Sequence, residues 1–126
     1  MHVRPANTDE VPAVMNVLDG AVLSITVETV RVGVEDGGTL VAVSGDDPAD
    51  GRILGALVLD GTHIEAVAVR RRRRGQGIGT ALVEAALDRR NRVTAEFDAD
   101  VRPFYEALGF NIEPLDEAER FRGERP

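Results

Sequence analysis

The sequence contains no cysteine, and none of its 15 basic residues is a lysine. The missing cysteines exclude a disulfide scaffold, a thiolate zinc site and a cysteine nucleophile. No apolar run approaches the roughly 20 residues of a membrane-spanning helix, and the first residues lack the apolar core of a signal peptide. We therefore expect a soluble, cytoplasmic protein of one domain, residues 1–126, with no metal and no membrane partner.

Acidic residues outnumber basic ones, 22 Asp and Glu against 15 Arg, which gives a formal net charge of −7. An acidic surface without lysine is typical of a high-salt cytoplasm, where salt screens its self-repulsion, or of a GC-rich genome. Five of the arginines are consecutive, Arg70–Arg74. They have no aromatic residues interleaved with them, so we expect no nucleic-acid partner.

Periodicity and turn signals predict an alternation of short strands and helices. The Asp60-Gly61 pair between two apolar runs is typical of a β-hairpin, and Thr8 is the expected N-cap of the first helix. Residues 21–34 fit either a helix or a strand. The expected strands are 2–4, 39–44, 53–59, 63–69, 93–97 and 110–114; the expected helices are 8–20, 77–90 and 101–108; residues 45–51 form a polar loop; and about 120–126 form a frayed tail.

The most informative stretch is an apolar strand that runs through the five arginines into a glycine-rich turn. The strand ends in Val67, Ala68 and Val69, and the turn is Gly75-Gln76-Gly77-Ile78-Gly79-Thr80. Glycines let the backbone approach a ligand closely, and the first N–H groups of the helix that follows have no intrahelical partner. The pattern therefore predicts a phosphate-binding loop.

Two motifs in this order resemble the GNAT superfamily of acyl-CoA-dependent N-acyltransferases. Its R-x-x-G-x-G/A signature falls on Arg74, Gly77 and Gly79, and its F-Y-x-x-L-G-F segment falls on Phe104–Phe110. The resemblance covers about residues 39–110. It implies a single α/β domain with a mixed, mainly antiparallel sheet flanked by helices, a core over 39–110, and helices on the acceptor side over 8–35.

The resemblance also implies an activity, namely transfer of an acetyl group from acetyl-CoA to an amine that attacks the thioester directly. The amine belongs to a small molecule, a protein N-terminus or a lysine, and the protein is a monomer or homodimer. Tyr105 is the implied proton donor to the leaving thiolate. The implied cofactor-binding residues are Val67, Ala68, Val69, Arg74, Gly75, Gln76, Gly77, Ile78, Gly79 and Thr80.

The base that deprotonates the amine is left open between Glu65 and His63. Both share a strand face with Val67 and Val69 by the period of two, and Glu65 is narrowly favoured. Many members of the superfamily carry Asn where this chain has Asp98, which removes any amide contact to pantetheine expected from that position.

Two other functions compete with this one. A CoA-binding sensor of the same fold would have lost catalysis. A dinucleotide-binding module is suggested by Gly75, Gly77 and Glu96, but Thr80 stands in place of the third glycine and the preceding hairpin predicts an antiparallel sheet.

Overall fold

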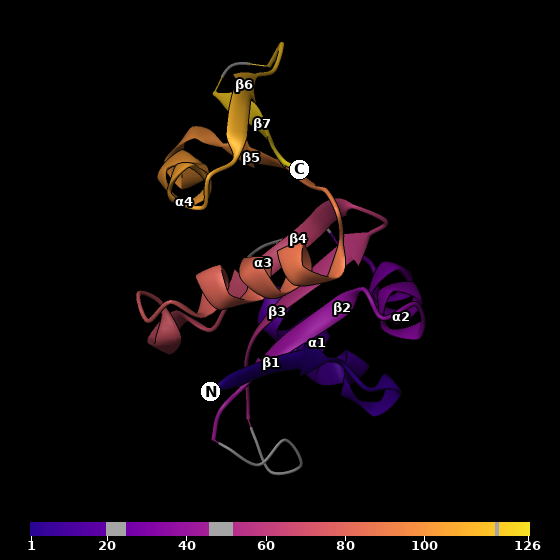
Figure 1. The fold of residues 1–126 in the computed structure, drawn as a ribbon. Helices are drawn as coiled ribbons and strands as arrows, with labels where there is room; N and C mark the ends of the chain where they lie inside the picture. The colour runs from indigo at the N-terminus through magenta and orange to yellow at the C-terminus, as the bar shows by residue number, and fades with distance from the viewer. Residues whose placement is uncertain (20–24, 46–51, 118) are drawn as a thin grey trace.

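The computed structural model describes residues 1–19, 25–45, 52–117 and 119–126, whose strands form one sheet with helices on both faces (Figure 1). The strands are β1 (His2–Pro5), β2 (Thr39–Val43), β3 (Ile53–Asp60), β4 (His63–Val69), β5 (Val93–Asp98), β6 (Asn111–Pro114) and β7 (Arg120–Arg125). The helices are α1 (Val11–Asp19), α2 (Val27–Glu35), α3 (Ile78–Arg89) and α4 (Arg102–Ala107), with short 3-10 turns η1 (Thr8–Glu10), η2 (Arg71–Arg73) and η3 (Ala99–Val101).

The strand order across the described residues is β1-β2-β3-β4-β5-β7-β6. Among the strands that the structure describes, only β4 and β5 pair in parallel, and the other neighbours are antiparallel. This confirms the expected mixed, mainly antiparallel sheet. The β3–β4 hairpin turns at Gly61 with φ of 62°, and its antiparallel pairing rules out the doubly wound parallel sheet of the dinucleotide-binding alternative.

The sheet separates two apolar cores. One contains buried side chains of α3 and α4, such as Leu82 and Tyr105, packed on β3 and β5. The other contains buried side chains of α1 and α2, such as Val14 and Val30, packed on β2, β3 and β4. Alternate residues of the central strands therefore face opposite layers, and neither strand face reaches water over most of β2 and β3. No helix in the described ranges is long and apolar enough to cross a membrane.

The sequence leaves residues 21–34 open between a helix and a strand. The described part of this segment contains the helix α2. The Thr26 side chain accepts a hydrogen bond from the Thr29 N–H (3.1 Å) and caps α2. Gly33 and Val30 lie on the buried side of that helix. The helix end expected at Gly20 and most of the polar loop over 45–51 lie outside the described residues.

The prediction of a frayed C-terminal tail is wrong. Residues 120–125 form β7, which lies between β5 and β6 and pairs with both. Phe121 stacks on Phe97 of β5 with ring centroids 6.4 Å apart. A Cβ at position 123 would lie 3.0 Å from Phe97 and 3.2 Å from Phe110. Gly123 therefore allows the close approach of two aromatic rings, and this packing holds the end of the chain in the sheet.

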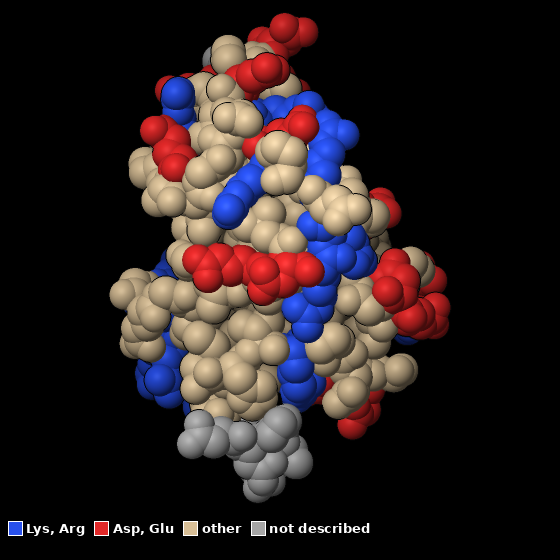
Figure 2. All heavy atoms as spheres, viewed as in Figure 1, with Lys and Arg blue, Asp and Glu red and all other residues tan. Residues whose placement is uncertain are grey.

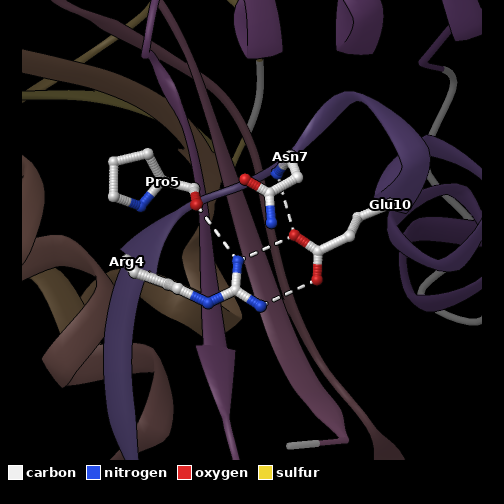
Figure 3. Close-up of polar contacts among 4 residues, drawn as sticks. All are labelled: Arg4, Pro5, Asn7 and Glu10. Carbon is white, nitrogen blue, oxygen red and sulfur yellow. Dashed lines mark hydrogen bonds and ion pairs between the residues drawn. The ribbon is translucent and has the colours of Figure 1, made fainter. Parts of the chain in front are cut away.

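The first helical segment begins at Thr8, but its N-cap is Asn7 and not Thr8 as predicted. Figure 3 shows the contact that fixes this turn to β1. Arg4 donates two hydrogen bonds to the Glu10 carboxylate (2.7 and 2.8 Å), and the Asn7 N–H donates a third (2.8 Å). These bonds lower the pKa of Glu10, the Arg4 hydrogen bond being the largest cause.

We expect Glu10→Gln to lower the free energy of unfolding by about 1 kcal/mol at pH 7, since it removes a charge-assisted pair at the protein surface. Because the pKa of Glu10 is lowered in the folded state, its stabilisation is complete above the ordinary Glu pKa of about 4.3 and is lost as the pH falls through the folded value. Urea unfolding from pH 7 to pH 3 should show the two proteins converging. A constant difference would contradict this role.

Candidate functional site

The glycine-rich turn presents backbone N–H groups at the start of α3. Gly75 and Gly77 have φ of 79° and 80°, in the left-handed region that favours glycine, and Gly77 is the N-cap of the helix. The Ala81 N–H donates to the Gly77 carbonyl (3.0 Å), so the intrahelical bonds begin there. No side chain caps this end of α3. The N–H groups of Ile78, Gly79 and Thr80 are therefore left to bind an anion.

Three segments far apart in the sequence meet at Gly79. A Cβ built at this position would lie 3.4 Å from Cε1 of Phe104 on α4 and 3.8 Å from Cγ2 of Val69 at the end of β4. Phe104, the first residue of the second motif, thus contacts the last glycine of the first motif. The adjacent Tyr105 is brought to the same corner of the molecule.

Strands β4 and β5 diverge beyond their first residues. In the described chain they pair at one position, His63 with Thr94, where the Thr94 N–H donates to the Thr62 carbonyl (2.9 Å). On the other edge of β4 the Arg70 N–H donates to the Leu54 carbonyl (2.8 Å). Arg70, and every second residue before it in the regular part of the ladder, therefore directs its backbone groups toward β3. Because alternate residues bond to opposite sides, the N–H and C=O groups of Val67 and Val69 point into the opening between β4 and β5.

Two charged side chains lie at the borders of this opening. The Arg74 Nε donates a long hydrogen bond (3.4 Å) to the Val69 carbonyl. On β5, Asp98 accepts a hydrogen bond from Arg120 of β7 (2.9 Å). Asp98 therefore takes part in a cross-strand ion pair.

Tyr105 is almost fully buried, with 4% of its surface exposed, and its ring stacks on Phe97 at a centroid distance of 4.3 Å. Phe104 and Phe110 contact it edge-on at 5.0 and 5.1 Å. Burial raises its pKa to about 12, so the hydroxyl stays protonated at neutral pH. That hydroxyl has no hydrogen-bond partner among the described residues. It is not fully buried either, so it reaches solvent.

The two candidate bases lie on β4 at a β-bulge. The register against β3 shifts between Val58 and Leu59, which pair with Ala66 and Ile64, so Glu65 is the extra residue. Glu65 is exposed and makes no side-chain hydrogen bond or ion pair within the described part of the chain. It lies two residues before Val67, at the bulged end of the opening.

The expectation that His63 shares a face with Val67 and Val69 is wrong. Ile64, its neighbour, packs in the same core as those two valines, because the bulge breaks the period of two. The His63 Nδ1 is instead 2.8 Å from the Thr94 hydroxyl, at the one position where β4 and β5 pair.

No cluster of three His, Asp or Glu side chains in the described ranges is arranged to hold a metal ion. The described residues offer backbone N–H groups at the start of α3 and an open edge on β4, and Tyr105 packs against Phe104, which contacts the position of Gly79. Such a site binds an anion beside an extended, amide-containing ligand.

Residues 34–112, well over half of the chain, match the family model described as acetyltransferase (GNAT) domain. Among solved structures, Rv2747 from Mycobacterium tuberculosis, in complex with CoA and NLQ, is 26% identical with a TM-score of 0.72, over 90% of this chain and 74% of that one. No curated protein matches the chain.

Two further structures share the fold. The NatC complex bound to Gag peptide and CoA contains a chain that is 22% identical with a TM-score of 0.79, over 100% of this chain and 99% of that one. An acetyltransferase of the GNAT family from Bacillus cereus is 17% identical with a TM-score of 0.75, over 98% and 95% of the two chains.

We expect Gly77→Glu to abolish CoA binding, since it adds a negative charge and a side chain at the cap of α3. Gly37→Glu is the matched control: its φ is 79°, nothing lies within 4 Å of an added Cβ, and it lies in the turn between α2 and β2. Calorimetric titration with CoA should show binding by the wild type and the control only. Equal binding by both variants would remove the α3 N-terminus from the site.

Proposed function

Because the chain belongs to the GNAT acetyltransferase family, we propose that it transfers the acetyl group of acetyl-CoA to a primary amine. The observation that carries this proposal is that the uncapped start of α3 and the open edge of β4 meet at Gly79, where Phe104, which packs against Tyr105, is also in contact. Each part suits one part of the reaction. Direct attack of the amine on the thioester needs no enzyme nucleophile, and the chain has no cysteine to provide one.

Acetyl-CoA binds with its pyrophosphate on the N–H groups of Gly77–Thr80, where the helix dipole adds to hydrogen bonding. Its pantetheine arm carries amides, and it lies along Val67–Val69 as an added strand. The inward-pointing N–H and C=O groups of Val67 and Val69 are its partners. One of these N–H groups polarises the thioester carbonyl and stabilises the oxyanion as the amine attacks.

Glu65 is our choice for the base that takes the proton from the attacking ammonium, directly or through water. An alkyl ammonium has a pKa of about 10, so it must lose a proton before attack. Glu65 is exposed at the bulge and has no partner of its own among the described residues. His63 is a weaker candidate, since its Nδ1 contacts Thr94.

Tyr105 stabilises the departing thiolate by donating a hydrogen bond from its hydroxyl. Its pKa of about 12 lies well above the ~8.5 of an ordinary thiol, so full proton transfer from the tyrosine is unfavourable. A buried hydroxyl that remains neutral is a fixed hydrogen-bond donor. The proton that finally reaches the thiol comes from the acceptor amine, by way of the base.

The acceptor is a cationic amine, and helices α1 and α2 are on its side of the site. The net charge of −7 favours encounter with a positive substrate. The NatC neighbour was solved with a Gag peptide and CoA, which supports a peptide N-terminus as one acceptor class. A lysine side chain or a small metabolite presents the same nucleophile.

We expect Tyr105→Phe to lower kcat by about 100-fold while the Kd for acetyl-CoA stays unchanged, because only a transition-state contact is lost. The hydroxyl has no partner in the described residues, so stability should stay near that of the wild type. Stopped-flow detection of free thiol and calorimetry measure the two constants. An unchanged kcat would remove Tyr105 from the mechanism.

Glu65→Gln should lower kcat at neutral pH by about 100-fold, and His63→Gln by much less. Rates from pH 6 to pH 10 locate the effect, because loss of a base is offset as the free amine accumulates at high pH. A larger loss in the His63 variant would exchange the two roles. Acetyl-CoA binding by the wild type without turnover of any amine would instead identify a CoA sensor of the same fold.

A further inference from the structure

A hollow of about 390 Å³ lies beside the glycine-rich turn, and its lining among the described residues is arginine except for Leu54. Its walls are Arg52 and Leu54 of the β3 segment and Arg70–Arg73 of the β4–α3 connection. Figure 2 shows basic side chains gathered at the lower left of the molecule, the side where that connection lies in Figure 1. A cationic hollow of this kind, on a protein with a net charge of −7, is suited to bind a specific anion.

The arginines of the hollow differ in what they bind. Arg70 is fixed to the protein, because its Nε donates to the Ile53 carbonyl (2.8 Å) and its Nη1 to the Asn16 side chain (3.0 Å). The side chains of Arg52 and Arg71–Arg73 are exposed and make no hydrogen bond or ion pair in the described part of the chain. Elsewhere, arginines pair with carboxylates, as Arg92 does with Glu124 (2.7 Å). Acidic partners are abundant, but these guanidinium groups are left for a ligand.

The hollow is continuous with the start of α3. A second, smaller hollow of about 180 Å³ is lined by Leu54, Arg73, Gln76 and Ile78, together with Met1 and the two residues that follow β2, Ser44 and Gly45. The two hollows share Leu54 and Arg73. A ligand whose phosphates lie on the N–H groups of Ile78–Thr80 can therefore extend along Gln76 and Arg73 into the arginine hollow.

We propose that this hollow binds the 3′-phosphate of CoA and so selects CoA over its dephosphorylated form. The inference rests on the proposed function, because it requires the pyrophosphate to lie at α3. CoA carries a phosphomonoester on the ribose, apart from the pyrophosphate, with a charge of about −1.5 to −2 at pH 7. Guanidinium groups match such a phosphate through bidentate hydrogen bonds. Arg52 and Arg73 approach it from two separate segments, so the hollow holds the phosphate from both sides.

The test compares CoA with dephospho-CoA by calorimetry at physiological ionic strength. The wild type should bind CoA at least about tenfold more tightly, since one charge-assisted hydrogen bond is worth that much. Arg52→Ala/Arg73→Ala should weaken CoA to the level of dephospho-CoA and change dephospho-CoA by less than about twofold. Neither side chain has a partner to lose in the described residues, and circular dichroism checks the fold.

Arg31→Ala/Arg89→Ala is the matched control. It removes the same charge, from α2 and from the far end of α3, about 18 Å from the glycine-rich turn at 1.5 Å per residue. It should keep the tenfold preference. If the Arg52/Arg73 variant lost affinity equally for both ligands, the arginines would attract them only through their general positive charge. That result would overturn the inference.

Binding of CoA and dephospho-CoA by the wild type distinguishes failure of this inference from failure of the proposed function. Equal affinity of the wild type for CoA and dephospho-CoA overturns the inference and leaves the proposed function in place. Binding of neither ligand overturns the proposed function, and the inference with it.

Discussion

The site depends on the divergence of β4 from β5. Buried backbone N–H and C=O groups require hydrogen-bond partners, and a strand in the middle of a sheet normally finds them in its two neighbours. Here β4 pairs with β3 along its length but with β5 at His63 alone among the described residues. Val67 and Val69 therefore lie in the middle of a sheet with one edge open. A ligand that carries amides can complete that edge.

The packing around the opening holds it in place. On one side, β5 is bound by β7, and Phe97 stacks on Tyr105 and Phe121. On the other side, β4 is bound by β3 and covered by α1 and α3. Phe104 bridges the two halves where it contacts the position of Gly79. The aromatic cluster of β5 and α4, which includes Tyr105, is thus joined to the start of α3 through Phe104.

Local signals predict most of the elements that hold the proposed site. The glycine-rich turn, the Asp60-Gly61 hairpin and the Phe104–Phe110 segment are each specified by neighbours in sequence, and all were predicted correctly in kind. What failed depends on distant contacts. Strand β7 resembled a frayed tail because Gly123 and its charged neighbours show no pattern until Phe97 and Phe110 are packed against them. The bulge at Glu65 is a property of the β3–β4 register, which residue alternation alone does not reveal. The arginine hollow likewise needs Arg52, which is 18 positions before Arg70.

The proposed acyl-CoA site is tested most directly by titrating the ¹⁵N-labelled protein with acetyl-CoA and following the amide NMR shifts. We predict that the largest shifts fall on the N–H groups of Val67 and Val69 and on those of Ile78–Thr80, and that NAD at the same concentration moves none of them. Shifts confined to other surfaces, or equal responses to both compounds, would contradict the claim that the open edge of β4 and the start of α3 form an acyl-CoA site.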